Sequence, residues 1–345
     1  MQQYAMLISP STNRVYARTA ARMAANEIRV FSALALDGVI EDVEETVIGG
    51  VPYLAFRSDS LSARDLRLLA NLSSLYALFK VRGDLLEPIA VERLDRYEDD
   101  LVTILKYVGK TNEQFTKLLL NVTAAVALTP DRILGGGVKV LDPMCGRGTT
   151  LNQAAMYGWD GYGVEVDKRD FEAYGAFVQR WLKDKRLKHT AVTSRVKREG
   201  RGVGQRTRVE FAATKERYRA GDLQVLEIVN ADTQRSGEVF RKGAFDLIVT
   251  DAPYGVQHAA VKDTRALTRK PTEVLEAAIP VWTDLLRPGG AIGLSWNLYT
   301  TSRAELVAIL EDAGLEVQDA EPFLDFEHRV DQAINRDLIV ARKPR

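Results

Sequence analysis

Residues 140–150 read VLDPMCGRGTT, an apolar run that ends in an aspartate and is followed by two glycines and a helix-like stretch. Glycines at a strand-to-helix turn let a ligand approach the backbone, and the first turn of the helix offers free N–H groups. The dinucleotide-binding fingerprint would place a third glycine at position 151, which is a leucine. Asp142 would repel a diphosphate, whereas the ammonium and sulfonium charges of S-adenosylmethionine would not be repelled. The segment therefore favours S-adenosylmethionine over a dinucleotide.

Two further acidic positions follow along the chain. Residues 163–167 read GVEVD and end the next predicted strand about 20 residues on, where an acidic side chain accepts hydrogen bonds from both ribose hydroxyls. Glu165 is our first candidate for the ribose and Asp167 the second. Asp232 follows the third strand, where it either accepts a hydrogen bond from the adenine amino group or is a solvated surface aspartate.

The fourth motif, residues 246–255, reads DLIVTDAPYG. An exocyclic amine is a poor nucleophile because its lone pair is delocalised into the ring. The Asp251 carboxylate and the Ala252 carbonyl would accept its hydrogens and direct the lone pair towards the methyl group. Pro253 makes the turn rigid, and Tyr254 would stack on a base extruded from its helix. The alternative is a strand-to-loop turn with a packed tyrosine; the four motifs in this order favour the catalytic interpretation.

Short apolar runs alternate with helix-like stretches after residue 137, which is typical of a parallel α/β sheet. We predict strands at residues 138–141, 161–165, 224–229, 245–250, 291–296, 315–320 and 338–342, and helices at 115–128, 150–157 and 302–313. An apolar stripe at helical spacing is assigned to the core rather than to a cofactor site; it comprises Phe171, Tyr174, Val178, Trp181 and Leu182.

The chain divides into two predicted domains. Residues 1–108 form a small α/β domain without a catalytic cluster, which we interpret as a docking or structural domain. It has strands at 4–8 and 51–56, a helix-like stretch at 18–31 and a helix capped by Ser62, whose apolar face extends from Leu66 to Tyr76. Residues 109–345 form the catalytic domain. They include a basic insertion at about 183–219, with 13 basic and 4 acidic residues, which we interpret as a hairpin around residues 207–214. This insertion is a candidate polyanion-binding surface, or a solvated loop unrelated to substrate.

The composition excludes several classes of site. The 47 basic and 47 acidic residues cancel, so the net charge indicates no partner. Cys145 is the single cysteine and the three histidines are scattered, so we expect neither a disulfide nor a metal site. The first residues lack the pattern of a signal peptide, and no apolar run is long enough to span a membrane. We therefore expect a cytoplasmic protein without a membrane partner; its oligomeric state is left open.

The motifs resemble the RNA methylase family, whose catalytic domain is shared by THUMP-containing tRNA guanosine N2-methyltransferases and by amino-methyltransferases with a (D/N)PPY signature. Residues 142–149, DPMCGRGT, are similar to that family's DPxCGxGT, and residues 251–255, DAPYG, to its DPPYG. The resemblance covers about residues 112–345. It implies a Rossmann-like class I methyltransferase, with a seven-stranded, mostly parallel sheet whose last strand is antiparallel, and S-adenosylmethionine as cofactor.

The resemblance also implies where the cofactor and substrate bind. The cofactor-binding residues are Asp142, Cys145, Gly146, Gly148, Thr149, Glu165, Asp167 and Asp232, and the catalytic residues are Asp251, Ala252, Pro253 and Tyr254. A helix at residues 112–126 occupies the place of the family's helix at the cofactor's methionine end. Ala252 stands where the family has proline, but the acceptor there is a backbone carbonyl. The N-terminal unit resembles the ferredoxin-like domain of tRNA guanosine N2-methyltransferases.

These observations predict methylation of guanosine N2 in tRNA, so the expected partner is a nucleic acid. Aspartate before the proline turn favours guanine N2 over adenine N6. Three alternatives remain: DNA amino-methylation, protein glutamine methylation, and a cofactor-binding RNA module without activity. We expect no room for a DNA target-recognition domain after the final strands. Glutamine methylation uses asparagine before the proline turn, and the presence of Asp251 and Tyr254 favours an enzyme.

Overall fold

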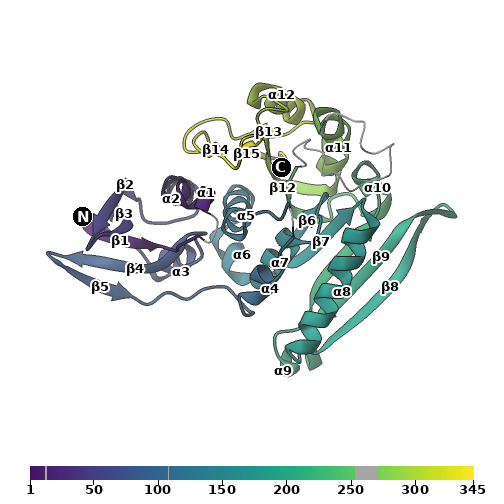
Figure 1. Cartoon of the computed structure of the whole chain (residues 1–345), viewed down its shortest axis with the longest axis horizontal. Helices are drawn as coiled ribbons and strands as arrows, with labels where there is room; N and C mark the ends of the chain where they lie inside the picture. The colour runs from purple at the N-terminus through teal and green to yellow at the C-terminus, as the bar shows by residue number, and fades with distance from the viewer. Residues whose placement is uncertain (12–13, 108, 253–270) are drawn as a thin grey trace.

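The computed structural model describes residues 1–11, 14–107, 109–252 and 271–345. The described strands form two sheets, which lie on opposite sides of helix α5 (Glu113–Ala127) (Figure 1). The smaller sheet is built from the N-terminal residues, and the larger one from the rest of the chain.

The N-terminal unit is a five-stranded antiparallel sheet with the order β2-β3-β1-β4-β5. The succession β-α-β-β-α-β, with this strand order, is that of the ferredoxin-like motif. The elements of the unit are β1 (Gln2–Ile8), α1 (Arg14–Ala17), α2 (Ala20–Leu34), β2 (Glu41–Ile48), β3 (Val51–Ser58), α3 (Ala63–Leu69), β4 (Leu75–Arg82) and β5 (Leu85–Ile89).

Helix α3 is shorter than the sequence pattern indicated. Its start matches, because Ser62 and Asp65 form a reciprocal capping box. The predicted end of the helix does not match, because Asn71, Ser73 and Ser74 favour turns over helix. Tyr76, which the apolar spacing placed on the helix, lies in β4.

The larger sheet has ten strands in the order β13-β15-β12-β11-β6-β7-β10-β9-β8, with β14 paired to β15. Five adjacent strands are parallel: β12 (Leu286–Asn297), β11 (Phe245–Asp251), β6 (Lys139–Asp142), β7 (Asp160–Glu165) and β10 (Gln224–Asn230). The flanking strands are β15 (Asn335–Arg342), antiparallel to β12, then β13 (Glu316–Val317), β14 (His328–Arg329), β9 (Arg201–Phe211) and β8 (His189–Arg198).

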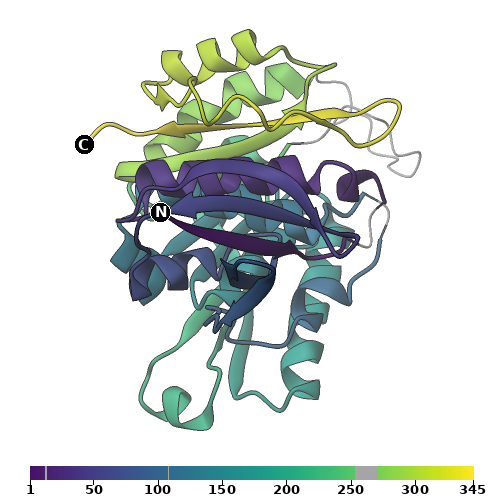
Figure 2. The ribbon, with the colours of Figure 1, turned by 90° about the vertical axis from the view of Figure 1, so that its left-hand side faces the viewer.

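Helices cover both faces of this sheet, because successive side chains of each strand point to opposite faces. Val140 packs in the core beneath α5, whereas its neighbour Leu141 packs with α11 (Pro271–Leu285) and α12 (Arg303–Asp312) on the other face. Figure 2 shows α11 and α12 above the sheet, with the N-terminal sheet towards the viewer. The remaining helices are α4 (Asp100–Thr103), α6 (Pro130–Gly135), α7 (Thr149–Met156), α8 (Lys168–Asp184), α9 (Lys215–Arg219), η1 (Thr233–Arg235) and α10 (Ser236–Val239).

Helix α5 belongs to the cores of both units. One apolar cluster extends from the N-terminal sheet through α5 to the larger sheet. A buried polar network lies at the same junction. Glu27 accepts hydrogen bonds from Ser73 and from Asn121 of α5, and the Tyr157 hydroxyl donates to Asn121 Oδ1 at 2.8 Å. The two units are therefore joined by packing as well as by the chain.

The predicted parallel α/β core agrees with the structure, and the apolar stripe of α8 is buried as expected. The predicted strands are present, but the one expected at 315–320 is reduced to Glu316–Val317. Two predictions about the larger sheet were wrong. Its described residues form ten strands rather than seven, because the basic insertion adds β8 and β9 and because β14 joins β15. The hairpin turn is at Glu199-Gly200 rather than around residues 207–214, because both turn residues adopt the positive φ that a two-residue type I′ turn requires.

Candidate active site

Four of the predicted acidic residues lie at the carboxyl ends of four adjacent parallel strands. Asp142 ends β6, Glu165 ends β7, Asp251 ends β11, and Asp232 follows β10 by two residues. β6 is the strand at which the strand order reverses, with β7 on one side and β11 on the other. In open α/β sheets the crevice at such a switch point is the usual ligand site. The fold therefore brings the four motifs to one edge.

The glycine loop after β6 needs two of its glycines for different reasons. Gly146 has φ +51° and no neighbouring atoms where a Cβ would lie, so only its backbone angle limits which residues can replace it. Gly148 has φ +77°, and a Cβ there would lie 2.3 Å from the ring of Tyr174. Gly148 is also the N-cap of α7 and has no side chain to occupy the first N–H groups. The loop can thus approach a ligand with its backbone.

Glu165 connects this loop to the next strand. Its carboxylate accepts hydrogen bonds from the backbone N–H of Gly146 at 2.8 Å and of Asp167 at 2.6 Å. Burial raises the pKa of Glu165 to about 7, although these two hydrogen bonds oppose the shift. Burial likewise raises the pKa of Asp142 to about 6, and the negative charge of Asp251 adds to that shift. The two carboxyls are poised to lose their protons near neutral pH.

Asp167 and Asp232 have structural partners at this edge. The Asp167 side chain accepts from Arg169 N at 2.7 Å and caps α8. The Asp232 side chain accepts from Gln234 N at 2.9 Å and caps η1. Each carboxylate therefore fixes the start of a helix beside the predicted cofactor edge.

Asp251 is held by side chains from three other segments. The Thr111 hydroxyl donates to Asp251 Oδ2 at 2.6 Å, the Ser295 hydroxyl donates to Oδ1, and Arg336 Nη2 lies 3.4 Å from Oδ2. The next residue, Ala252, is buried, and its N–H donates to Ser295 O at 2.8 Å. Pro253 and Tyr254 lie outside the described residues. The carboxylate is consequently fixed in position beside the end of β6.

Cys145 and Thr149 lie in and after the glycine loop. Cys145 is buried, and burial raises the pKa of its thiol well above the usual value. A Cβ on Gly163 would lie 2.6 Å from its sulfur, so Cys145 fills the space beneath that glycine. Thr149 begins α7, and its hydroxyl lies 3.4 Å from the hydroxyl of Tyr107. Cys145 thus acts in packing, without the reactive thiolate of a nucleophile.

The sequence did not reveal several side chains that the fold adds to the site. Tyr107 and Thr111 come from the segment before α5, which showed no clear pattern. The Arg147 guanidinium lies over the Tyr107 ring, 4.8 Å from its centroid, and its Nε donates to Asp170 at 2.8 Å. Ser295 could have been found by aligning strand ends, because it lies opposite Asp251 in the register of β11 and β12. No motif in the sequence around Arg336 indicated that it belongs to the site.

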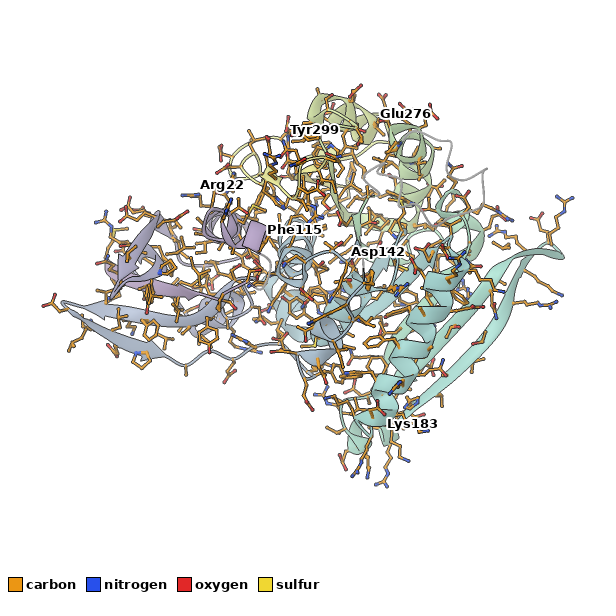
Figure 3. The ribbon with its side chains drawn as sticks, viewed as in Figure 1. Arg22, Phe115, Asp142, Lys183, Glu276 and Tyr299 are labelled. Atoms are coloured by element: carbon orange, nitrogen blue, oxygen red, sulfur yellow. The ribbon has the colours of Figure 1, made fainter. Side chains whose placement is uncertain are left out.

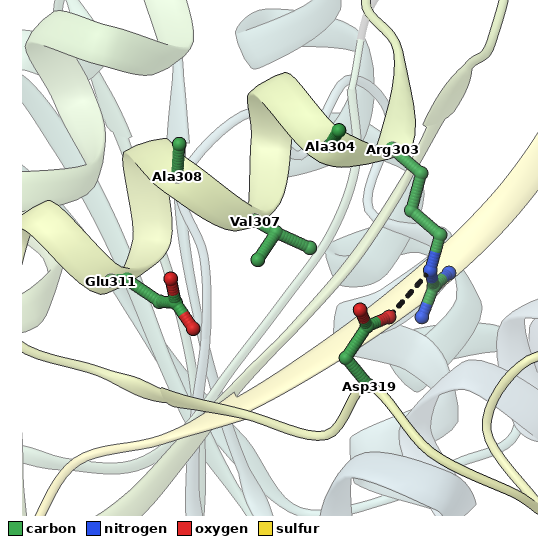
Figure 4. A pocket seen from close by; sticks show the side chains of 6 residues that line it. All are labelled: Arg303, Ala304, Val307, Ala308, Glu311 and Asp319. Atoms are coloured by element: carbon green, nitrogen blue, oxygen red, sulfur yellow. Dashed lines mark hydrogen bonds and ion pairs between the residues drawn. The ribbon is translucent and has the colours of Figure 1, made fainter.

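A surface hollow of about 430 Å³ lies elsewhere, along α12 (Figure 4). Arg303 and Asp319, which form an ion pair with Nε and Oδ1 2.9 Å apart, line one side of it, and Val307 and Glu311 lie along the helix. None of the predicted site residues that the structure describes contributes to this hollow. The strand ends are therefore the better candidate for chemistry.

Two classes of feature were searched for in the described residues. They contain no group of three or more histidine, cysteine, aspartate or glutamate side chains that could hold a metal ion. No described helix has the length and apolar character needed to cross a membrane.

Comparison with known proteins identifies one family. Residues 119–286 match the family model described as UPF0020, RMKL-like, methyltransferase domain. The chain matches no curated protein.

Solved structures of low sequence identity are also similar to the chain. A geranyl diphosphate methyltransferase in complex with SAM is 13% identical, with a TM-score of 0.38, over 67% of this chain and 85% of that one. A TehB-like SAM-dependent methyltransferase from Corynebacterium glutamicum is 17% identical, with a TM-score of 0.32, over 61% and 81%. The [4+2]-cyclase SpnF is 15% identical, with a TM-score of 0.40, over 67% and 80%.

Proposed function

Because residues 119–286 match the family model of UPF0020, RMKL-like, methyltransferase domains, we propose that the chain uses S-adenosylmethionine to methylate an exocyclic amine of a nucleobase. The proposed target is guanosine N2 in tRNA. One observation carries the proposal: Asp251 and Asp142 end adjacent parallel strands, so a fixed amine acceptor lies directly beside the glycine loop.

The chemistry of the strand ends fits S-adenosylmethionine. Glu165 would accept hydrogen bonds from the ribose hydroxyls, and Asp232 from the adenine amino group. Val166, directly after Glu165, is 60% exposed and offers an apolar surface for the adenine ring. Asp142 and the start of α7 would face the methionine end. These carboxylates attract a cationic ligand, and they would repel a diphosphate.

The bound cofactor supplies an electrophilic methyl group on a sulfonium. Asp251 would accept a hydrogen bond from the attacking amine and offset the positive charge that develops on its nitrogen. Thr111, Ser295 and Arg336 hold the carboxylate in place, so it needs no reorganisation when the base arrives. The bond between the nitrogen and the methyl carbon would form as the bond between that carbon and the sulfonium sulfur breaks, which leaves a neutral thioether. The methylated amine would then lose one proton to water. An aspartate before the proline turn supports guanine N2 as the target.

The test is mass spectrometry of nucleosides after incubation with isotope-labelled S-adenosylmethionine and bulk tRNA. We expect labelled N2-methylguanosine with the wild-type protein and, at the same early time, about a hundredth of that amount or less with Asp251→Ala. Parallel reactions with DNA and with glutamine-containing peptides separate the other amine targets. Label in DNA or peptide alone would refute the tRNA assignment, and no label in any substrate would refute the proposed activity.

A further inference from the structure

The basic hairpin formed by β8 and β9 has its turn at the same edge of the sheet as the candidate site. β9 runs antiparallel to β10, with Gln205 opposite Asn230 and Phe211 opposite Gln224. Asn230 is the carboxyl end of β10, so the beginning of β9 and the turn at Glu199-Gly200 extend past that end. Figure 1 shows the hairpin projecting beyond the sheet next to α10.

The fold divides the basic insertion into two separate clusters. The tip cluster contains Arg195, Lys197, Arg198 and Arg201, all of them exposed. The base cluster lies where the hairpin begins and where β9 ends; its exposed members are Lys183, Arg186, Lys188, Lys215, Arg217 and Arg219. Lys183, at the end of α8, is far from Asp142 in the view of Figure 3. Ten residues of β8 separate the clusters by roughly 30 Å at about 3.3 Å per residue.

The charge partners of each cluster bear on its access to an external anion. Among the described residues, Arg195, Lys197 and Arg201 form no ion pair, and Glu199 is the single acidic residue in the turn. At the base, Arg217 lies 3.5 Å from Asp222. Lys183, Lys188 and Lys215 form no ion pair among the described residues, so in this respect they match the tip cations. The tip therefore has cations that an external anion can reach without displacing a carboxylate.

The tip is held by specific contacts. Glu199 and Gly200 have φ of 50° and 78°, which fits a tight two-residue turn. Val196 and Val203 are buried against the rest of the domain. Arg198 donates a hydrogen bond to Gly237 O of α10 at 3.3 Å. These contacts fix the backbone of the tip relative to the strand ends.

We propose that this tip, through Arg195, Lys197 and Arg201, binds the phosphate backbone of the RNA whose target nucleotide enters the site. The inference rests on the proposed function and specifies how that substrate is held. The base cluster lies at the opposite edge of the sheet, so it takes no part in this contact. Lysine and arginine pairs with phosphates give affinity that falls with salt, without reading sequence.

The test compares two variants of the full chain that each lose three positive charges. The tip variant carries Arg195→Gln, Lys197→Gln and Arg201→Gln, and it retains Arg198 and its contact with α10. The control variant carries Lys183→Gln, Lys188→Gln and Lys215→Gln in the base cluster. Binding of bulk tRNA is measured by fluorescence anisotropy as a function of salt, alongside steady-state methyl transfer and calorimetric affinity for S-adenosylmethionine.

The tip variant is expected to flatten the slope of log affinity against log salt by roughly 2 to 3 units, since each lost phosphate contact removes about 0.7 to 0.9. Its KM for tRNA should rise, while kcat and cofactor affinity stay at wild-type values. The control variant should retain the wild-type slope and KM. Equal salt slopes in the wild type and both variants, or equal losses of tRNA affinity in the tip and control variants, would overturn the inference. A wild-type protein that binds tRNA but transfers no methyl group would instead refute the proposed function, and the salt slopes would still report on the tip.

Discussion

Arg336 and Asp251 form a largely buried ion pair at the end of the parallel sheet, with Arg336 Nη2 3.4 Å from Asp251 Oδ2. Their side chains are 6% and 16% exposed, and the guanidinium also lies over the Phe115 ring, 4.6 Å from its centroid. Arg336 comes from β15 and Phe115 from α5. The carboxylate that we place at the reacting amine is thus supported by the last strand and by the helix that joins the two units.

Removing the Asp251 carboxylate should abolish most of the chemistry and leave cofactor binding intact. Loss of one preorganised electrostatic partner typically lowers the rate by a factor of about 10²–10³. Asp251→Asn keeps the shape and is the matched control for packing. Single-turnover methyl transfer at saturating cofactor measures the rate, and calorimetry measures cofactor affinity. Full activity in Asp251→Ala would show that the turn after β11 is structural.

Arg336→Gln should lower both stability and rate. Breaking a buried ion pair by removing one partner costs roughly 3–5 kcal/mol, because the remaining charge loses its compensation. Arg336→Lys keeps the charge but loses the planar contact with Phe115, so we expect it to recover part of the stability. Thermal unfolding and single-turnover rates report the two effects separately. A rate unchanged in Arg336→Gln would mean that Thr111 and Ser295 suffice to position Asp251.

The affinity for S-adenosylmethionine should depend on the protonation of Glu165. Glu165→Ala should weaken binding by roughly 1–3 kcal/mol, the cost of leaving buried hydroxyls unpaired. In the wild type the pKa of Glu165 is raised to about 7, so affinity should rise with pH through that value as the acceptor becomes ionised. Calorimetry between pH 6 and pH 8, at roughly one unit on either side of that pKa, tests this. The same pH dependence in Glu165→Gln would assign the titration to another group.

The stability of the ligand-free protein should show the opposite trend. The folded-state pKa of Glu165 lies above its ordinary value of 4.5, so the folded protein holds a proton that the unfolded chain releases. This contribution is fully present below the unfolded pKa and is lost as pH rises through about 7. Urea unfolding of the wild type and Glu165→Gln across that range isolates the contribution. We expect the pH dependence to be weaker in the variant.

Two glycines of the loop form a matched pair for a steric test. Gly146→Ala and Gly148→Ala both place a side chain at positive φ, which costs roughly 1–2 kcal/mol. Only Gly148→Ala also drives a Cβ into the Tyr174 ring, so it should be the more destabilising of the two and should weaken cofactor binding further. Denaturant unfolding of both variants measures the difference. Equal losses of unfolding free energy in the two variants would show that the Tyr174 ring moves aside without destabilising the protein.

The parallel core could be predicted because its strands are continuous apolar runs that end in charged or glycine-rich turns. Asp142, Glu165 and Asp251 were found for the same reason, since each ends such a run. Strands β2, β4 and β5 of the N-terminal unit were missed. The first residues of β4 were assigned to the preceding helix. Strands β2 and β5 lie at the edges of the sheet with many exposed side chains, so their sequences lack a clear apolar face.

The support around Asp251 could not be predicted, because it depends on long-range contacts. Thr111 is 140 residues away along the chain and Arg336 is 85. Neither lies in a pattern of its own, and only the packing of α5 and β15 onto the sheet brings them together. The hairpin turn was misplaced for a local reason: a positive φ at Glu199 is uncommon for that residue type and leaves little trace in the sequence.

Helix α5 couples the unfolding of the two parts of the molecule. Its buried side chains serve both sheets, and Asn121 within it bonds to Glu27 on one side and to Tyr157 on the other. Deleting the first hundred or so residues would remove Glu27 and leave Asn121 without that hydrogen-bond acceptor. It would also expose the apolar side of α5 to solvent. The predicted domain boundary near residue 108 therefore does not separate two independently folding units. Both parts should unfold in a single cooperative transition.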